Sequence, residues 1–443
     1  MPIKLSDHFT YRKLLRFTLP SITMMIFTSV YSVVDGLFVS NLIGENALSA
    51  VNIMFPVAMI IGAAGFMLGA GGSAIVARTM GEGKQELANR YFTMIILCVL
   101  GLGLTLSAVS LLFVEPLARL VGASDLLMDD CLAYGRVVLG GSFVFMLQIS
   151  FQTFFVTAEL PKIGLFFSLA SGITNIVLDY LFIGVLKIGI AGAAWGTVLG
   201  YGVGGVLPLL FFLKPPIGAL RLCPTRLYWR ELKNACINGS SELMSNLSAS
   251  LIGILYNLQL MRMVGELGVA AYSVMMYVDF AFAAVFLGFS MGSGPIISFH
   301  YGAGNEDELK SIFRKSVTLI AIASVTMVAL AQVLGRPLAM AYVGYNPDLL
   351  EMTVHGFRIF ALSYLFCGMG VYGSGFFTAL CNGAVSALIS FLRLFLFRGG
   401  MVLLLPLLLK LDGIWLAVVV ADGLGAAVAV WLMWRYRKRY HYL

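Results

Sequence analysis

Charged residues are scarce in this chain. Only 12% of its 443 residues are Asp, Glu, Lys or Arg, whereas 60% are hydrophobic. A soluble domain carries about 25% charged residues, so the composition excludes an ordinary soluble fold. Apolar runs recur along the whole length, and a run of roughly 20 residues is long enough to cross a hydrocarbon layer about 30 Å thick as a helix. We therefore predict an all-α integral membrane protein.

Residues that build disulfide frameworks, metal centres or catalytic groups are also few and dispersed. The six cysteines include no Cys-x-x-Cys pair, the four histidines stand apart, and no Walker A motif is present. We expect no enzymatic activity, no cofactor, no use of ATP and no metal other than Na⁺. The net charge of +7 resides in short segments between apolar runs, where basic residues set the topology, so we expect no nucleic-acid partner.

The apolar runs predict twelve transmembrane helices. With the N-terminus inside, twenty of the 29 Lys and Arg residues fall on the cytoplasmic side of these helices. We expect a multi-pass protein of the plasma (inner) membrane that has both termini in the cytoplasm and acts as a monomer in the lipid bilayer. The predicted spans are 17–39, 47–76, 92–114, 131–157, 163–185, 191–213, 236–263, 268–298, 317–339, 355–379, 383–406 and 413–434.

An internal repeat relates the first six helices to the last six. Matching residues in the two halves are separated by a constant offset of 221 positions, as from Gly44 to Gly265 (265 minus 44). We call this distance in the numbering the repeat offset. Weak internal similarity of this kind is typical of transporters that consist of duplicated bundles. The matching positions are Gly44-Glu45 with Gly265-Glu266, Gly81-x-Gly83 with Gly302-x-Gly304, Pro116-Leu117-Ala118 with Pro337-Leu338-Ala339, Gly135 with Gly356, and Gly192 with Gly413.

The repeat offset also predicts how the two copies are oriented. It contains six spans, an even number, so both copies enter the membrane in the same direction and form a parallel repeat about a pseudo-two-fold axis along the membrane normal. We predict two six-helix bundles, at residues 1–213 and 236–443, joined by a cytoplasmic linker at residues 214–235.

Ionisable residues inside the spans are the clearest functional candidates, because each costs roughly 2.5–3.5 kcal/mol to insert. Asp35 and Asp179 fall in the outer part of their helices, and Thr197, on a helix of opposite direction, reaches the same depth. Clustered carboxylates, amides and hydroxyls can bind a proton or Na⁺, although each acid could instead be neutralised by structural hydrogen bonds. The candidate cation site is Asp35, Asn175, Asp179 and Thr197, with Tyr31 and Tyr134 as supporting residues and Pro20 as a hinge below Asp35.

Charged residues in the second half are expected to pair. Asp279 and Arg393 both lie deep in their helices, and Arg398 and Asp422 both lie in the outer halves of theirs. We favour two structural or gating ion pairs, with substrate contact as the alternative. Four further residues are candidates for the lining of an amphiphilic cavity: Gln148, Gln152, Tyr256 and Asn257.

The features that carry a family resemblance are the segment VDGLFVSNLIGENALSAVN at residues 34–52, the Asn175-x-x-x-Asp179 pair and the six-plus-six repeat. In these features the chain resembles the multidrug and toxic compound extrusion (MATE) family. The resemblance covers nearly the whole chain and looks closest to the MepA-like and DinF-like branches. It implies two bundles that form a V around a central cavity, and a cation site at Asp35, Asn175, Asp179 and Thr197.

The resemblance also implies a function, namely that entry of H⁺ or Na⁺ drives the export of amphiphilic, often cationic organic compounds. Another branch of the family uses acidic residues in helices seven and ten. In this chain helix ten, the predicted span 355–379, contains neither Asp nor Glu, so the chain departs from that branch. The alternative is a flippase for a lipid-linked precursor, which would need inward basic residues. Arg393 and Arg398 are the only deep arginines that the sequence offers.

Overall fold

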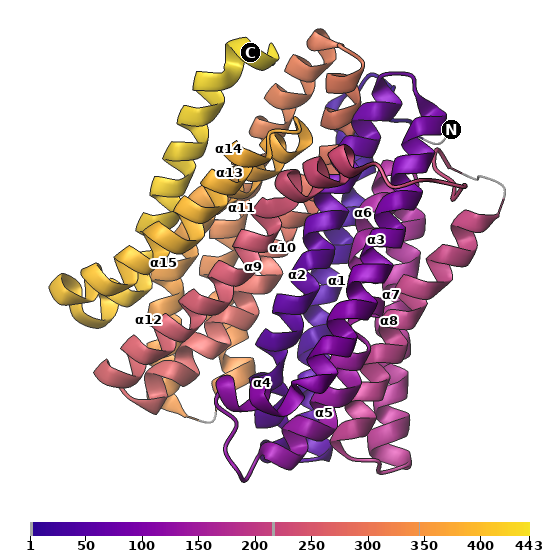
Figure 1. Ribbon diagram of the computed structural model, residues 1–443. Helices are drawn as coiled ribbons and strands as arrows, with labels where there is room; N and C mark the ends of the chain where they lie inside the picture. Colours follow the sequence, from indigo (N-terminus) through magenta and orange to yellow (C-terminus); the bar gives the residue numbers. More distant parts are fainter. Residues whose placement is uncertain (1–2, 215–217, 345) are drawn as a thin grey trace.

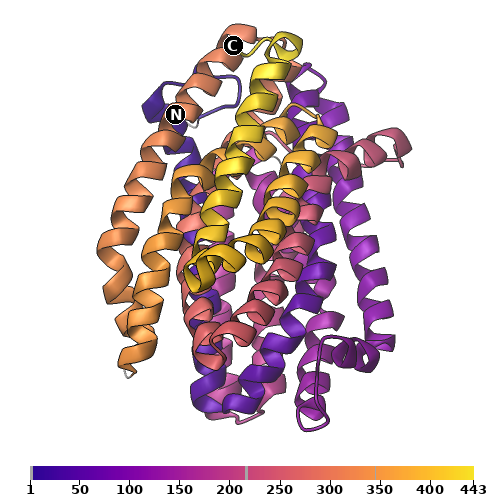
Figure 2. The ribbon, with the colours of Figure 1, turned by 90° about the vertical axis from the view of Figure 1, so that its left-hand side faces the viewer.

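The computed structural model describes residues 3–214, 218–344 and 346–443, and every regular element in these ranges is a helix. The helices form two bundles that lie side by side, α1–α8 and α9–α15 (Figure 1). Both chain termini lie at the same end of the molecule, which we call the terminal end (Figures 1 and 2). The bundles meet along two main helix pairs, α2 with α9 and α1 with α10.

The N-terminal bundle contains six membrane crossings and one short helix. Its elements are α1 (Tyr11–Leu42), α2 (Glu45–Gly81), α3 (Gln85–Leu112), the short α4 (Val114–Leu120), α5 (Met128–Gly140), α6 (Ser142–Thr157), α7 (Pro161–Asp179), the π-helix η1 (Tyr180–Val185) and α8 (Ile190–Leu213).

The C-terminal bundle repeats this order. Its elements are α9 (Trp229–Met263), α10 (Glu266–Gly302), α11 (Glu306–Val343), α12 (Pro347–Phe360), the short 3-10 helix η2 (Ala361–Ser363), α13 (Tyr364–Ala379), α14 (Gly383–Ser390), the π-helix η3 (Phe391–Phe397) and α15 (Arg398–Tyr440).

These elements make twelve crossings. Nine helices in the described ranges are long and apolar enough to span a membrane, and the bent pair α5–α6 makes a tenth. The stretch from α14 to the end of α15 turns sharply at Lys410, whose φ of 53° is left-handed, so it supplies two crossings instead of one. The remaining crossing is α9, whose 35 residues include a polar half at the terminal end. The predicted all-α fold with twelve helices in two bundles is confirmed.

Some details differ from the predicted spans. The predicted span 131–157 is two helices bent by 50° at Gly141, and α9 begins at Trp229, inside the segment that we expected to be a linker. Hydropathy does not register polar helical turns outside the hydrocarbon layer. It therefore missed the first turns of α9 and also those of α11, where the Asn305 side chain caps the helix by accepting from the Glu308 N–H at 3.1 Å.

The repeated glycines mark equivalent helix ends. Gly83 after α2 and Gly304 after α10 have φ of 76° and 66°, in the left-handed region that other residues rarely adopt. The repeat offset therefore records a structural equivalence, because the same turn ends the second helix of each bundle.

The hydrophobic core is shared at one end of the molecule and divided at the other. Near the terminal end a single cluster joins residues of both bundles, such as Phe92 and Phe151 with Phe289 and Phe376. Toward the opposite end the clusters are separate: one lies within residues 39–194, one within residues 252–418, and a small third one consists of Ala271, Val274, Val343 and Leu349. The bundles are thus packed together at the terminal end and have separate cores at the opposite end.

Backbone contacts between the bundles at the terminal end are reciprocal. A Cβ added to Gly81 of α2 would overlap the carbonyl oxygen of Phe299 in α10, and one added to Gly302 of α10 would overlap the carbonyl oxygen of Arg78 in α2. The repeat offset exchanges these two contacts. Because lipid tails are as apolar as the side chains, membrane helices gain from the close approach that small residues allow.

A second reciprocal pair of contacts lies deeper along the same helices. A Cβ at Gly71 would lie 2.6 Å from the backbone nitrogen of Gly239, and a Cβ at Gly292 would lie 3.0 Å from the Cα of Thr18. The repeat offset relates Gly71 to Gly292 and Thr18 to Gly239. The interface between the bundles therefore follows the pseudo-two-fold axis predicted from the repeat.

The segment before α1 connects the two bundles at the terminal end. The Leu5 N–H donates to Glu159 Oε1 at 2.7 Å, in the turn between α6 and α7. The Phe9 N–H donates to Glu308 Oε1 at 2.8 Å, and Lys315 Nζ donates to the Phe9 carbonyl at 2.5 Å, both from α11. Leu5 and Phe9 are fully buried, so this N-terminal strap (residues 5–9) is part of the closed end.

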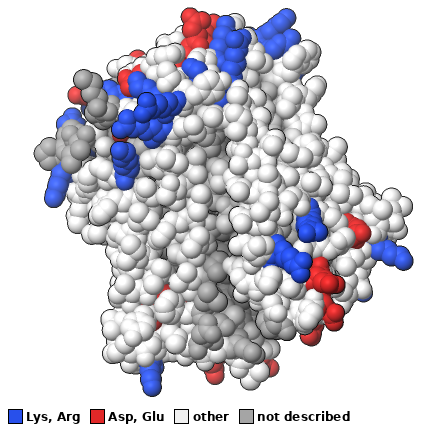
Figure 3. Space-filling model, turned by 180° about the vertical axis from the view of Figure 1, so that it is seen from behind, with Lys and Arg blue, Asp and Glu red and all other residues white. Residues whose placement is uncertain are grey.

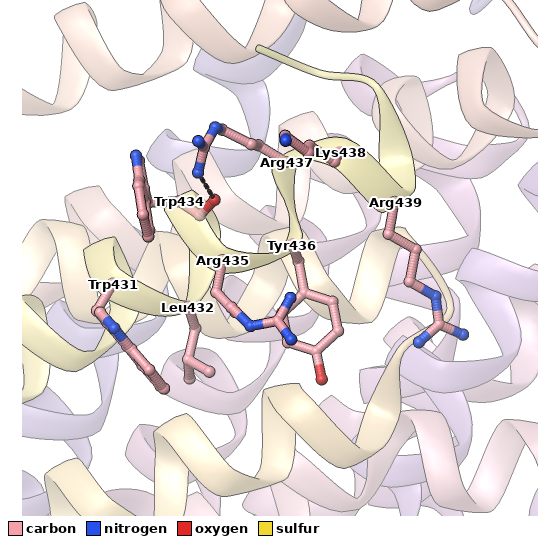
Figure 4. A pocket seen from close by; sticks show the side chains of 8 residues that line it. All are labelled: Trp431, Leu432, Trp434, Arg435, Tyr436, Arg437, Lys438 and Arg439. Atoms are coloured by element: carbon pink, nitrogen blue, oxygen red, sulfur yellow. Dashed lines mark hydrogen bonds between the residues drawn. The ribbon is translucent and has the colours of Figure 1, made fainter.

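The last helix ends in an aromatic and basic segment at the terminal end. Figure 4 shows Trp431 and Trp434 beside four basic residues of the final turns of α15. The Arg437 guanidinium lies 4.0 Å from the centroid of the Trp434 ring. Tryptophan is typical of membrane–water boundaries. On the face in Figure 3, charged side chains gather at the upper end, at the lower edge and, on the right-hand side, from mid-height downward, and most of the surface between these groups is uncharged.

Candidate functional site

Three helices of the N-terminal bundle bring the predicted cation-site residues together. Asp35 lies on α1, Asn175 and Asp179 lie on α7, and Thr197 lies on α8, and both α1 and α8 pack against α7. Asp179 is the last residue of α7, and the π-helix η1 follows it directly. Single π-helical turns often occur at functional sites because they realign the side chains on either side.

Asn175 connects the site residues by hydrogen bonds. Its Nδ2 donates to Asp179 Oδ2 at 3.0 Å and to the Thr197 hydroxyl at 3.5 Å. The Thr197 hydroxyl donates its own proton to the Ala193 carbonyl at 3.0 Å, which leaves its lone pairs facing the site. Asp179 has no exposed surface, and Asn175 is 3% exposed. The donors on these side chains are therefore engaged.

Three acceptor atoms at the same place have no donor. Asp35 Oδ1, Asp179 Oδ1 and Asn175 Oδ1 are buried without a hydrogen-bond partner among the described residues. Asp35 lies against both Asp179 and Asn175, so the three side chains that carry these oxygens are in contact. Buried polar atoms in proteins are nearly always paired, and unpaired ones call for an explanation. A set of oxygen acceptors without donors suits a proton or a hard cation such as Na⁺.

Glycines of α7 and α8 allow this close approach. A Cβ at Gly196 would overlap the Asp179 carboxylate, and a Cβ at Gly200 would lie 2.9 Å from the Asn175 side chain. On the other side of α7, a Cβ at Gly172 would lie 3.2 Å from the Tyr31 ring. Sequence reasoning assigned no role to Gly196 or Gly172, because a need for close approach leaves no sign in hydropathy.

Tyrosines form one wall of the site. Tyr31 and Tyr134 are 9% and 5% exposed, and Tyr134 lies near both Asp35 and Asp179. Sequence reasoning missed Tyr201 of α8, whose hydroxyl meets that of Tyr31. The signal that could have found it was its position one turn after Thr197, the same i to i+4 spacing that relates Tyr31 to Asp35.

The other predicted residues of the first half lie on α1 and on α6. Pro20 is buried in the terminal half of α1, which runs as one helix from Tyr11 to Leu42, and its role as a hinge stays a prediction. Gln148 and Gln152 donate to Ser171 and Ser168 of α7, at 3.1 and 3.3 Å. These glutamines tie α6 to α7 within the bundle.

In the second half, the structure forms one of the two predicted ion pairs. Arg398 Nη2 donates to Asp422 Oδ2 at 2.9 Å. The expected pair of Asp279 with Arg393 is not formed: Arg393 Nη1 donates to the Cys367 carbonyl at 3.2 Å instead. The prediction rested on depth along the helices, and depth does not fix the direction in which a side chain points.

The two predicted cavity residues of α9 point to different surroundings. Tyr256 is 2% exposed and stacks on Tyr272 with ring centroids 4.8 Å apart. Asn257, the next residue, is exposed. Among the described residues no three His, Cys, Asp or Glu side chains gather as a metal site, so the candidate site rests on two carboxylates, an amide and a hydroxyl.

Comparison with known proteins agrees with this architecture. The family model MatE matches residues 20–181 and 243–400. Multidrug export protein MepA of Staphylococcus haemolyticus (strain JCSC1435) is 20% identical over 438 residues, which cover 97% of this chain and 94% of that protein. The FAD transporter of Shewanella oneidensis is 26% identical over 374 residues, which cover 81% of this chain and 80% of that protein.

Solved structures share the fold. A crystal structure of MATE in complex with MaL6 superposes with a TM-score of 0.91 at 22% identity and covers 97% of both chains. An outward-facing multidrug resistance MATE transporter of the MOP superfamily gives the same TM-score, identity and coverage. Because the MatE model matches most of both bundles, the chain belongs to the MatE family, the multidrug and toxic compound extrusion transporters.

Proposed function

We propose that this protein is a secondary active exporter that moves amphiphilic, often cationic organic compounds out of the cell in exchange for H⁺ or Na⁺. The observation that carries the proposal is the contact of Asp35 with Asp179 and Asn175, whose buried Oδ1 atoms all lack a donor among the described residues. Two carboxylates in contact inside a bilayer repel each other strongly. A proton or Na⁺ that enters the cluster removes this repulsion and supplies the missing partner.

Coupling then follows from differential affinity. A cation that binds the cluster more tightly in one conformation shifts the population toward that conformation, and a substrate that prefers the other conformation shifts it back. The core that is shared at the terminal end and divided at the opposite end is compatible with a molecule closed on one side. Alternation between this arrangement and one closed at the other end would move the substrate across.

The substrate class is supported by the relatives, several of which are named as multidrug export proteins. A flippase for a lipid-linked precursor is less favoured, because such a cavity needs free basic side chains. Arg398 is paired with Asp422, and Arg393 is held by the Cys367 carbonyl. Both deep arginines therefore already have a partner within the C-terminal bundle.

We place the terminal end in the cytoplasm and the protein in the plasma membrane. The basic residues of the last turns of α15 and of the segment before α1 lie at this end (Figure 1). Lys and Arg are enriched in cytoplasmic segments of membrane proteins, so this orientation is the one that the charge distribution favours. The bundles then diverge on the outer side, from which the exported compound leaves.

The test is efflux of ethidium from vesicles reconstituted with the purified protein under an imposed H⁺ or Na⁺ gradient. Asp35→Asn and Asp179→Asn remove the carboxylates and keep the side-chain volume. Asp412→Asn makes the same change at an exposed acid on the turn between the last two crossings and serves as the matched control. Melting temperature and elution volume report on folding for all three variants.

We expect one of the gradients to drive efflux by the wild type and by Asp412→Asn, and neither gradient to drive it through the other two variants. If neither gradient moves ethidium in the wild type, antiport of this compound is wrong. If Asp35→Asn and Asp179→Asn transport like the wild type, the cation-site assignment is wrong.

A further inference from the structure

The C-terminal bundle holds a second polar cluster at the position that corresponds to the cation site. The repeat offset relates Asp35 of α1 to Tyr256 of α9, and Tyr201 of α8 to Asp422 of α15. The acid and the tyrosine have thus exchanged places between two equivalent helices. Each bundle keeps one carboxyl and one phenol at this position but builds different surroundings around them.

The surroundings in the C-terminal bundle include a guanidinium. Arg398 Nη2 donates to Asp422 Oδ2 at 2.9 Å, and Asp422 has no exposed surface. Several polar atoms of the cluster remain unpaired among the described residues, namely Arg398 Nε, Asp422 Oδ1 and the Tyr256 hydroxyl. Tyr256 is 2% exposed. A purely structural network would be expected to satisfy such atoms, because a buried donor or acceptor left unpaired loses its hydrogen bond to water without replacement.

A second carboxylate, Asp279 of α10, belongs to the same cluster. Arg398 is the charge that acts on it most strongly, and the Tyr364 hydroxyl faces it. Asp279 is only partly buried, in contrast to Asp422, and within the described ranges it forms no ion pair. The titratable and charged groups that face Asp279 are Arg398 and Asp422 of α15, Tyr364 and Cys367 of α13, Arg393 of η3, Tyr256 of α9 and Tyr272 of α10 itself.

The charges of this cluster do not balance. The Arg398 guanidinium interacts with two carboxylates, Asp279 and Asp422, and is hydrogen-bonded to the second. Arg393 does not make up the difference, because it acts on a third acid, Glu242 of α9, as well as on Asp279. With Asp279, Asp422 and Glu242 all ionised, three carboxylates face two guanidinium groups, so one negative charge is in surplus. A charge inside a span is costly unless something neutralises it.

The geometry points to a proton-binding site at Asp279, second to the cation site of the N-terminal bundle. A proton from the aqueous side adds to a carboxylate oxygen of Asp279, no covalent bond breaks, and the cluster becomes neutral. Na⁺ fits less well, because the Arg398 guanidinium repels a metal ion and contributes only donors, whereas Na⁺ needs acceptor oxygens. The N-terminal cluster, by contrast, has no guanidinium and offers three free acceptors.

Protonation of Asp279 would also change the pairing around it. Neutral Asp279 no longer competes for Arg398, and its hydroxyl can donate to a neighbouring acceptor such as the orphaned Asp422 Oδ1. The role of this step in transport, as a second proton bound per cycle, rests on the proposed export function. The protonation itself does not, because it is a property of the cluster.

The test is infrared spectroscopy of the purified full-length protein, in which a protonated carboxyl gives a C=O band distinct from that of a carboxylate. The double variant Asp35→Asn, Asp179→Asn removes the acids of the cation site. In this background we expect one carboxyl band that grows as the pH falls, is lost when Asp279→Asn is added, and persists at a shifted frequency with Asp279→Glu. The glutamate variant keeps the carboxyl and shows that the loss is not a failure to fold.

Two outcomes would overturn the proposal. No pH-dependent band in the double variant would mean that Asp279 does not bind a proton in the accessible range. A band that survives Asp279→Asn but disappears with Glu242→Gln would assign the proton to Glu242 instead. Neither result depends on ethidium transport, so a failure of the export proposal would leave this measurement intact.

Discussion

Cys381 is a built-in reporter of closure at the terminal end. It lies between α13 and α14 and lines a pocket with Arg78 of α2 and Asn238 of α9, where the bundles meet. Burial raises the pKa of the Cys381 thiol from 9.0 to about 11, and the nearby Arg78 guanidinium opposes this shift only in part. The thiolate is the reactive species, so this cysteine should be nearly inert while the end is closed.

The perturbation is Gly288→Ala, at an inter-bundle contact that does not touch the reporter. A Cβ at Gly288 of α10 would lie 2.5 Å from the Cα of Ile22 in α1 and 2.8 Å from the Ser21 carbonyl oxygen. An added methyl group in a packed contact typically costs about 1–3 kcal/mol. Here the cost applies only to the closed state, in which α1 and α10 are in contact. At about 1.4 kcal/mol per factor of ten, this enlarges the open population about 5- to 150-fold.

The labelling rate of Cys381 should rise by the same factor, as long as the open state stays a minority. In an opened end the thiol returns toward its ordinary pKa of 9.0 from about 11. At a pH below both values, each unit by which the pKa falls raises the thiolate fraction about tenfold. A fall of about two units therefore makes Cys381 of an opened molecule react about 100-fold faster at neutral pH. In the wild type and in Gly288→Ala alike, the labelling rate of Cys381 should increase with pH, because the fraction of the thiol that is ionised increases with pH.

The assay is N-ethylmaleimide modification followed by mass spectrometry of the peptide that contains Cys381. Gly101→Ala is the matched control, since a Cβ there would meet nothing within 4 Å. Cys131, fully buried in the N-terminal bundle away from the terminal end, must keep its rate, which excludes general loosening. Equal Cys381 rates in Gly288→Ala and wild type would refute the idea that the contact of α1 with α10 holds this end closed.

Three further outcomes are expected. Gly196→Ala places a methyl group against the Asp179 carboxylate and should abolish gradient-driven ethidium efflux, with the melting temperature reporting on folding; unchanged efflux would show that this approach is not required. Glu308→Gln keeps the volume but weakens the charged anchor of the N-terminal strap, so protease cleavage near the N-terminus should become faster, and an unchanged cleavage rate would contradict the anchoring role. Asp422→Asn removes the hydrogen-bonded ion-pair partner of Arg398 and should destabilise the protein by about 3–5 kcal/mol, seen as a lower melting temperature; a shift within error would mean that Asp279 replaces the lost partner or that water reaches this guanidinium.

The parts of the site that depend on position along a helix could be predicted from the sequence. Asp35, Asp179 and Thr197 were expected to converge because the constant rise per residue of an α-helix places them at one depth, and the structure brings them together. Asn175 was expected to join them because it lies one turn from Asp179, and it does. The repeat likewise predicted two bundles, because its glycines mark equivalent turns.

The parts that depend on rotation about a helix axis could not be predicted. Arg393 and Asp279 were expected at similar depths, yet Arg393 points to the Cys367 carbonyl and Asp279 lies near Arg398 and Tyr364. The π-helix η3 adds to the difficulty, because it changes the rotation between Arg393 and Arg398. The bend at Gly141 and the approach of Gly196 to Asp179 depend on contacts between distant segments, and hydropathy carries no record of them.

The reciprocal contacts between the bundles make this single chain behave, at its terminal end, like a two-fold symmetric dimer. In such an interface each contact occurs twice, once on either side of the axis. Fusion of the two copies into one chain allows the residues away from the axis to diverge while Gly81 and Gly302 stay equivalent. One half can therefore hold two bare carboxylates and the other an arginine, so the mechanics of closure and the chemistry of ion binding can be altered independently.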